Sequence, residues 1–145
     1  MRIVVQRVNE ASVTVDGKVV GAIGKGALVL FGVHKNDDFS KIPWLANKLI
    51  NLRMFHNEEG KMDASLLDRK AEVLVVSQFT LYGNCCEGRR PDFTQAAPAA
   101  LAEPIYLEFV QELKKSIAHV ATGIFGAQME VALINDGPVT LLIDS

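Results

Sequence analysis

The stretch Ala27-Leu28-Val29-Leu30-Phe31-Gly32-Val33 is apolar along its whole length and says most about the fold. It has the length of a β-strand. A strand with no alternation of polar residues is typical of one that is covered on both faces. We therefore expect a central strand here, with other strands beside it and further structure packed over it.

Shorter strands are expected before this central strand. Residues 3–8 contain alternating apolar positions, and Asp16-Gly17 separates the apolar segments 13–15 and 19–23. An Asp-Gly pair between two such segments is typical of a β-hairpin turn. The first third of the chain is therefore predicted to be strands.

A helix is predicted after the central strand. Residues 42–50 place their apolar side chains on one helical face, with Ser40 as the expected N-cap and Pro43 in the first turn, where proline is tolerated. A short strand at 52–56 and a strong strand at 72–79 are expected to follow.

The second half of the chain is expected to contain a loop, a helix and two strands. Residues 83–98 lack any period and read as a long surface loop, and the stripe from Tyr106 to Ile117 predicts the second helix. Segments 129–134 and 139–143 read as the last strands. The fold class is therefore α/β, a single compact domain over residues 1–145 with a curved, mixed, barrel-like sheet and two main helices.

Composition limits the classes of function. The 145 residues carry 15 Lys and Arg against 17 Asp and Glu, a net charge of −2, so a nucleic acid partner is expected to be contacted over a small area only. The longest uncharged stretch, 116–129, contains polar residues and glycines and is not expected to span a bilayer. The N-terminus does not resemble a secretory signal, so we expect a soluble, cytoplasmic protein with no membrane partner.

Most familiar catalytic signatures are absent. No glycine-rich phosphate loop or serine nucleophile elbow is present, and His34, His56 and His119 lack metal-ligand spacing, so no metal and no cofactor are expected. The adjacent Cys85 and Cys86 are not expected to form a structural disulfide. They leave a thiol-dependent enzyme open as an alternative, because Arg89 and Arg90 nearby would favour a thiolate.

Two polar stretches are less ordinary. Ser77-Gln78-Phe79-Thr80-Leu81 places hydroxyl and amide groups where a buried strand ends, which is a common place for a site. Asn135-Asp136-Gly137-Pro138-Val139-Thr140 carries strong turn chemistry, and a simple hairpin turn would explain it without any function.

Taken together, these two stretches resemble the D-aminoacyl-tRNA deacylase family, which carries S-Q-x-x-L and N-x-G-P-V-T segments at this spacing. The resemblance extends over essentially the whole chain and includes Met1 to Val8, Gly88 to Phe93 and Thr122 to Met129. One difference is Cys86-Glu87, where related sequences often have basic residues. This difference would remove positive charge from a loop that faces the tRNA.

The resemblance implies a homodimeric hydrolase that cleaves the ester between a D-amino acid, or glycine, and the terminal ribose of tRNA, without metal or cofactor. It also implies that Gly137-Pro138 of one subunit enters the pocket of the other, with a cis peptide bond between them. Arg7 resembles the family arginine that supports this pair, although it could equally be a surface charge at a strand end.

A cis bond before proline costs only about 0.5–1 kcal/mol, so a packed site can impose it. It turns two successive carbonyl groups to the same side. The polar wall formed in this way would hold the amino group of a D-aminoacyl ester and collide with the side chain of an L-aminoacyl ester. Chirality would then be enforced by excluding the wrong hand.

The hydrolytic step is open between two mechanisms. Thr80 is the family's proposed nucleophile, but no activating base is identifiable in the sequence. Alternatively, the N–H groups around Phe79 and Thr80 stabilise the oxyanion while the tRNA ribose hydroxyl assists water, and Ser77 and Gln78 orient the ester. We favour this second mechanism.

Two further assignments stay open. Phe125 and Met129 are expected either to pack against the terminal adenine of the tRNA or to belong to the core. The alternative to the deacylase as a whole is a non-catalytic RNA- or nucleotide-binding module on the same fold.

Overall fold

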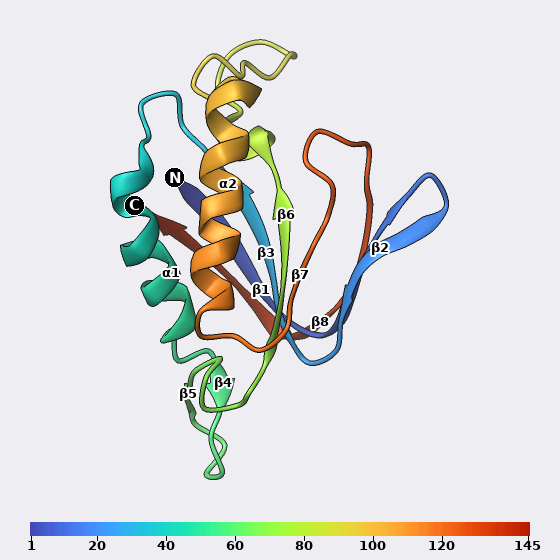
Figure 1. Cartoon of the computed structure of the whole chain (residues 1–145), viewed down its shortest axis with the longest axis vertical. Coiled ribbons are helices and arrows are strands. Elements are labelled where there is room, and N and C mark those ends of the chain that lie inside the picture. The colour runs from blue at the N-terminus through green and yellow to red at the C-terminus, as the bar shows by residue number, and fades with distance from the viewer.

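The apolar run quoted above forms β3 (Gly26–Gly32) at the centre of the sheet, as predicted. The computed structural model describes all residues from Met1 to Ser145. β3 pairs antiparallel with β1 (Arg2–Val15) on one side and parallel with β6 (Glu72–Ser77) on the other. The other strands of this mixed sheet are β2 (Lys18–Ile23), β7 (Val120–Thr122) and β8 (Glu130–Asp144), in the order β2-β1-β3-β6-β7 with β8 paired to β1 (Figure 1).

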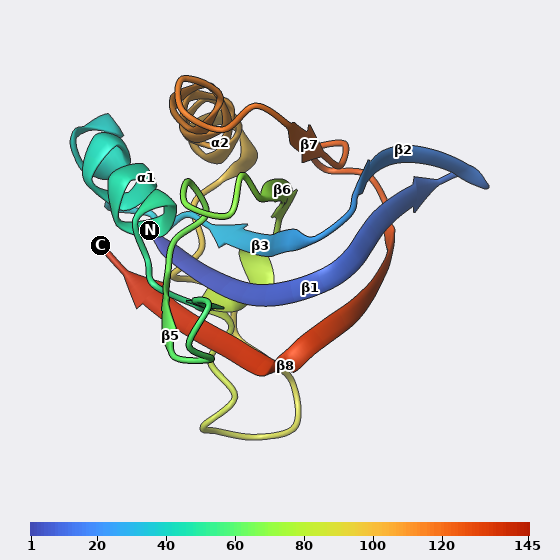
Figure 2. The same cartoon turned by 90° about the horizontal axis from the view of Figure 1, so that it is seen from below.

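Two helices cover one face of the sheet, and the sheet curls around the other face (Figure 2). α1 (Ile42–Ile50) and α2 (Ala99–Lys114) bury their apolar stripes against alternate residues of β1, β3 and β6. Phe31 of β3 stacks on Phe109 of α2 with ring centroids 4.6 Å apart. The alternate side chains of the same strands form a second, smaller cluster on the opposite face, which includes Leu28 and Leu74.

The two ends of the sheet approach each other where β2 meets β7. A Cβ atom on Gly21 of β2 would lie 2.3 Å from the carbonyl oxygen of Thr122 in β7, so only glycine permits this approach. The His119 ring also lies 3.1 Å from the carbonyl oxygen of Ala22. The sheet is therefore nearly closed, and the predicted barrel-like α/β fold with two helices is confirmed.

Three local predictions were wrong in their details. Ser40 is not the N-cap: Asp38 caps a short 3-10 helix (Phe39–Lys41) before α1 and accepts a 2.8 Å hydrogen bond from the Ser40 N–H. The strand predicted at 52–56 is only β4 (Phe55–His56), which pairs with β5 (Met62–Ala64). β6 ends at Ser77 because the chain then turns into a second 3-10 helix (Phe79–Tyr82).

The last two predicted strands are one strand. β8 pairs with β1 on both sides of residues 136–139, since Asn135 lies opposite Val8 and Thr140 lies opposite Gln6. Residues 136–139 of β8 therefore form a bulge, because they lie between two pairs whose β1 partners, Gln6 and Val8, are only two positions apart. The hairpin-turn interpretation of this segment is wrong, because the chain does not reverse direction.

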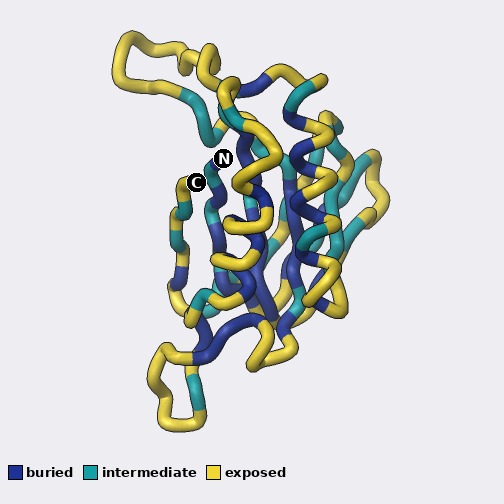
Figure 3. Tube along the Cα trace, turned by 60° about the vertical axis from the view of Figure 1, so that its left-hand side comes forward, coloured by how far each residue is buried: buried dark blue, intermediate teal, exposed yellow.

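Two exposed segments lie at opposite ends of the molecule. Residues 84–95, in the loop predicted at 83–98, and the tip of the β4–β5 hairpin are exposed, while the central strands β3 and β6 are largely buried (Figure 3). None of the helices combines the length and the apolar character needed to cross a bilayer.

Candidate active site

A cavity of about 380 Å³ opens at the end of β6, between α2 and the segment that leads into β8. Twelve of its fifteen lining residues are apolar, and the polar side chains among them are Ser77 and Gln78. An apolar cleft of this volume with a few polar groups at one end is typical of a small-molecule site. It lies at the carboxyl end of two parallel strands, where ligands commonly bind in sheets of this kind.

The strand β6 places the polar groups at this cavity. Ser77 lies beside Phe31 in the parallel register, and the N–H of Gln78 donates a 2.7 Å hydrogen bond to the Phe31 carbonyl oxygen. Ser77, Gln78 and Phe79 all line the cavity, so three of the four predicted catalytic residues lie together.

Thr80 lies next to the cavity rather than in its lining. Its hydroxyl accepts a hydrogen bond from the side-chain amide of Gln78, and no carboxylate or imidazole bonds to it. An amide cannot accept the hydroxyl proton at neutral pH, so nothing in the structure activates Thr80 as a nucleophile. Phe79 and Thr80 are also the first two residues of their 3-10 helix, where backbone N–H groups have no partner within the helix.

The long loop contributes an aromatic contact to this turn. Phe79 is 56% exposed, and its ring packs edge-on against Phe93 with centroids 5.1 Å apart. Phe93 ends the Gly88–Phe93 segment of the loop, so this segment approaches the site through Phe93, while Arg89 and Arg90 are exposed.

Phe125 and Met129 line the cavity from the segment before β8. Each is half-buried and also packs against one of the two apolar clusters, and the Phe125 ring lies 5.8 Å from that of Tyr106. Both open alternatives are therefore compatible with the geometry, because one side of each residue contacts the core while another faces the cavity.

Sequence reasoning missed Tyr106 as a wall of the cavity. It is buried, and its hydroxyl donates a 2.9 Å hydrogen bond to the Val75 carbonyl oxygen. Burial raises the pKa of this phenol to about 12, so it stays protonated in the physiological range. Its position on the apolar stripe of α2 predicted only a core residue. The sequence carries no signal that distinguishes a stripe residue lining a cavity from one buried in the core.

Gly137 and Pro138 form the exposed tip of the bulge in β8. The peptide bond between them is cis, which confirms that prediction. Neither residue lines the cavity of its own chain. The tip is therefore separate from the cavity within one chain.

Arg7 supports the base of this tip. Its side chain is only 3% exposed, so its interpretation as a surface charge is wrong. Nε donates to the Asp136 carbonyl oxygen at 3.0 Å and lies 3.1 Å from the Asp136 carboxylate, while Nη1 donates to the Met54 carbonyl oxygen at 2.6 Å. The guanidinium thus ties the bulge to the chain before β4.

Asn135 closes the bulge from the side. Its side-chain oxygen accepts the N–H of Val139 and its amide nitrogen donates to the Val139 carbonyl oxygen, both at 3.1 Å. The side-chain amide of Asn135 therefore bonds the backbone of Val139 as a paired strand would, and it joins the two ends of the bulge. Sequence reasoning assigned Asn135 only to turn chemistry.

The structure offers no suitable arrangement of residues for metal binding or for thiol catalysis. No group of three or more His, Cys, Asp or Glu side chains lies close enough to hold a metal ion. Cys85 and Cys86 are free, exposed thiols in the loop, and neither lines the cavity. The thiol-dependent alternative therefore has no supporting contact.

Comparisons with known proteins identify the family of the chain. A model of the family described as D-Tyr-tRNA(Tyr) deacylase matches residues 4–144. D-aminoacyl-tRNA deacylases of Thermosipho africanus and Protochlamydia amoebophila are 56% and 51% identical to the whole chain, which covers 97% and 96% of their lengths.

Solved structures share the fold. A "c-Myc DNA Unwinding Element Binding Protein" superposes with a TM-score of 0.94 at 42% identity, and the match covers 100% of this chain and 99% of the other. A second, described as "a probable eukaryotic D-amino acid tRNA deacylase", gives a TM-score of 0.87 at 17% identity, covers 99% and 98% of the two chains and supports the fold alone.

The family match and the curated relatives define the chain as an enzyme, a hydrolase of the deacylase class. Its six-stranded mixed sheet and two helices form the fold that it shares with the similar solved structures. The chain belongs to the D-Tyr-tRNA(Tyr) deacylase family.

Proposed function

We propose that this enzyme hydrolyses the ester of D-aminoacyl-tRNA and of glycine carried by the wrong tRNA, and releases the free amino acid and tRNA. The observation that carries the proposal is the cavity itself, where Ser77 and Gln78 form the polar end of an otherwise apolar cleft. Such a cleft suits one aminoacylated adenosine at the end of a tRNA, which agrees with the small net charge of the chain.

The two ends of the cavity have different roles in substrate binding. Ser77 and Gln78 orient the acyl carbonyl and the ribose of the terminal adenosine. Phe125 and Met129 supply an aromatic ring and a polarisable side chain on which the adenine packs. The exposed Arg89 and Arg90 contact tRNA phosphates near the acceptor end.

Hydrolysis uses water rather than Thr80 as the nucleophile. The N–H groups of Phe79 and Thr80 donate hydrogen bonds to the carbonyl oxygen and stabilise the negative charge that develops on it. The neighbouring ribose hydroxyl of the tRNA positions the attacking water. The bond between the acyl carbon and the ribose oxygen then breaks, and that oxygen takes a proton. Positioning and oxyanion stabilisation suffice because the ester is already activated.

Chirality is enforced across a homodimer. Gly137 and Pro138 are exposed and lie outside the cavity of their own chain, yet Arg7 and Asn135 hold their bulge firmly. A firmly held, exposed tip is suited to insertion into the cavity of a second copy. There its carbonyl groups would hold the amino group of a D-aminoacyl ester and exclude the side chain of an L-aminoacyl ester.

We place the enzyme in the cytoplasm as a quality-control hydrolase of translation, with residues 1–145 acting as one deacylase domain. A second candidate is a binding module that does not cleave its ligand. It is favoured only by the 42% identical relative, which is named for binding a DNA unwinding element.

A paired time course on D-Tyr-tRNA and L-Tyr-tRNA tests the proposed reaction. We expect rapid release of D-tyrosine and almost none of L-tyrosine. Binding of both tRNAs without release would favour the second candidate, and loss of activity in a Cys85→Ser, Cys86→Ser double variant would restore the thiol enzyme.

Mixing two variants tests the shared site. Gln78→Ala damages the cavity and Gly137→Ala damages the tip, so a mixed dimer would retain one undamaged site. An equal mixture that exchanges subunits should recover about a quarter of wild-type activity, since half of the dimers are mixed and one site in each is intact. No recovery despite proven exchange would show that cavity and tip act within one chain.

A further inference from the structure

Arg2, at the start of β1, contacts the turn that follows β6. Nη1 of its guanidinium donates a 3.2 Å hydrogen bond to the carbonyl oxygen of Leu81, and the guanidinium carbon lies 5.3 Å from the centre of the Tyr82 ring. Leu81 directly follows Thr80. Arg2 therefore touches the 3-10 helix that carries Phe79 and Thr80.

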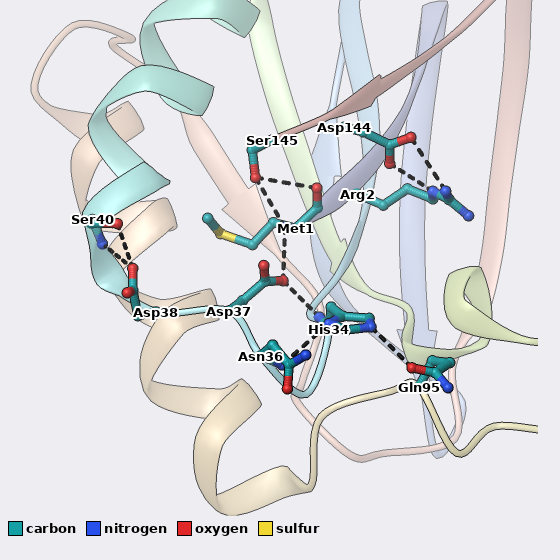
Figure 4. A network of polar contacts seen from close by, with 10 residues as sticks. All are labelled: Met1, Arg2, His34, Asn36, Asp37, Asp38, Ser40, Gln95, Asp144 and Ser145. Atoms are coloured by element: carbon teal, nitrogen blue, oxygen red, sulfur yellow. Dashed lines mark hydrogen bonds and ion pairs between the residues drawn. The ribbon is translucent and has the colours of Figure 1, made fainter.

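The carboxylate of Asp144 fixes the direction of this guanidinium. Nε and Nη2 of Arg2 donate to the two carboxylate oxygens of Asp144 at 2.7 and 3.2 Å (Figure 4). The two residues also lie opposite each other in the register of β1 and β8. A bidentate pair of this kind sets the plane of the guanidinium and leaves Nη1 free for Leu81.

The turn itself has few constraints of its own. None of its four residues is buried, and no side chain caps its beginning. Its backbone is closed by bonds from the Leu81 N–H to Gln78 and from the Gly83 N–H to Thr80, at 3.2 and 2.9 Å. An external hydrogen bond to the Leu81 carbonyl therefore adds a substantial part of its restraint.

Gly32, the strand partner of Arg2, also contacts this turn. Gly32 of β3 pairs with Arg2, and a Cβ atom on Gly32 would lie 3.1 Å from both the Gln78 carbonyl oxygen and the Leu81 Cβ. The turn rests closely on β3 at this point. Arg2 and Gly32 thus bound it from adjacent strands.

His34 makes a second contact with the Tyr82 ring. The His34 ring lies 5.2 Å from the Tyr82 ring, and the His34 N–H donates to Asp37 at 2.7 Å. Asp37 also pairs with the Met1 ammonium at 2.7 Å (Figure 4). Tyr82 therefore contacts two side chains, Arg2 and His34, and both are tied to the start of β1.

We propose that Arg2, oriented by Asp144, is a positioning residue that fixes the turn carrying Phe79 and Thr80 for hydrolysis. The inference rests on the proposed function, because it assigns the oxyanion donors to that turn. Arg2 does not touch the substrate. It acts through the Leu81 carbonyl and the Tyr82 ring, so its loss should affect the chemical step more than the binding of tRNA.

Steady-state kinetics on D-Tyr-tRNA with Arg2→Ala test this role. Because small displacements of a positioned group lower rates steeply, we expect kcat to fall about tenfold while KM changes less than about threefold. Asp144→Asn should lower kcat in the same direction, and the double variant should be no worse than Arg2→Ala alone, since both act through one contact. Arg53→Ala, which breaks an exposed 2.7 Å pair with Asp63 on the β4–β5 hairpin, is the matched control and should leave kcat unchanged.

Amide hydrogen exchange measured by NMR supplies a readout independent of activity. The N–H groups of Leu81 and Gly83 should exchange about tenfold faster in Arg2→Ala, while those of β3 should not change. If Arg2→Ala does not fold, Asp144→Asn carries the same two measurements.

Unchanged kcat and unchanged exchange at Leu81 and Gly83 in an active, folded variant would overturn the inference. A rise in KM alone would also overturn it, because it would make Arg2 a tRNA contact. If the wild-type enzyme itself releases no D-tyrosine, the proposed function fails, and the exchange rates still decide whether Arg2 fixes the turn.

Discussion

Replacing Arg7 by lysine tests the support of the Gly137-Pro138 tip without removing its positive charge. The guanidinium serves two carbonyl oxygens at once, with Nε 3.0 Å from Asp136 and Nη1 2.6 Å from Met54. A lysine ammonium is a single point donor and can serve only one of them. Since the side chain is 3% exposed, water cannot replace the missing bond.

The size of the effect follows from this loss of one charge-assisted hydrogen bond, which contributes about 1.5–3 kcal/mol. With a loss of about 2 kcal/mol, Tm should fall by roughly 6 °C for a chain of this length. If the whole loss of about 2 kcal/mol destabilises the native position of the tip, conformations with a displaced tip become up to about 30-fold more populated, because 1.4 kcal/mol corresponds to a factor of ten. Hydrolysis of L-Tyr-tRNA should then rise by up to that factor.

Thermal unfolding and the rates on both Tyr-tRNA enantiomers measure the two effects. Arg53→Lys is the control, because Arg53 makes an ion pair with Asp63 at 2.7 Å but is 69% exposed. An exposed pair contributes about 0.2–1 kcal/mol, so the control should hardly move either measurement. An Arg7→Lys enzyme with the Tm and the D-to-L selectivity of the wild type would refute the reasoning.

Three further changes test other parts of the molecule. Thr80→Ala should keep more than roughly a tenth of kcat, because the hydroxyl bonds only the Gln78 amide and has no base, and a trapped threonyl ester in the wild type would contradict this. Gly137→Ala would place a Cβ 2.4 Å from the Val139 nitrogen, so the tip must shift and kcat/KM on D-Tyr-tRNA should fall about tenfold; unchanged kinetics would remove the tip from the site. Hydrogen bonds from the Ser65 N–H and hydroxyl lower the pKa of Asp68 below its ordinary 3.8, so they stabilise the fold above that pH and are lost as the pH falls through the lower value. Asp68→Asn should therefore have a lower Tm than the wild type at pH 6 and should lose less Tm than the wild type between pH 6 and pH 2. Parallel Tm–pH curves for the variant and the wild type would count against this.

The fold was predictable where one residue period persists over a whole element. The stripe of α2 is of this kind, because its apolar side chains face the sheet from end to end, whereas β3 was predictable because apolar side chains cover both of its faces. The continuity of β8 could not be predicted, since it depends on β1 pairing with residues on both sides of the bulge. The cap of the first helix was misplaced for a similar reason: Asp38 and Ser40 are both good capping residues, and only the backbone path decides between them.

The polar residues of the site were predictable, and the family resemblance also pointed to Phe125 and Met129, but the other walls were not predicted. Ser77 and Gln78 follow an apolar strand, and polar groups at a strand end are visible in a sequence. Tyr106 and Phe93 come from a helix and a loop that are distant in the chain, so their approach to the site depends on tertiary packing. The contact of Arg7 with Met54 likewise joins residues 47 positions apart.

One strand, β1, holds both working segments of the chain through main-chain carbonyl groups. Arg2 bonds Leu81 beside the cavity, and Arg7 bonds Asp136 at the base of the tip. Arg7 follows Arg2 by five positions, which is about 16 Å along a strand, and an odd separation directs their side chains to opposite faces. Because the rigid strand keeps turn and tip apart in this way, flexing of one chain would not bring its own tip into its own cavity. If the proposed handedness filter needs both segments, it therefore requires a second copy of the chain, and this separation is the physical argument for the proposed homodimer.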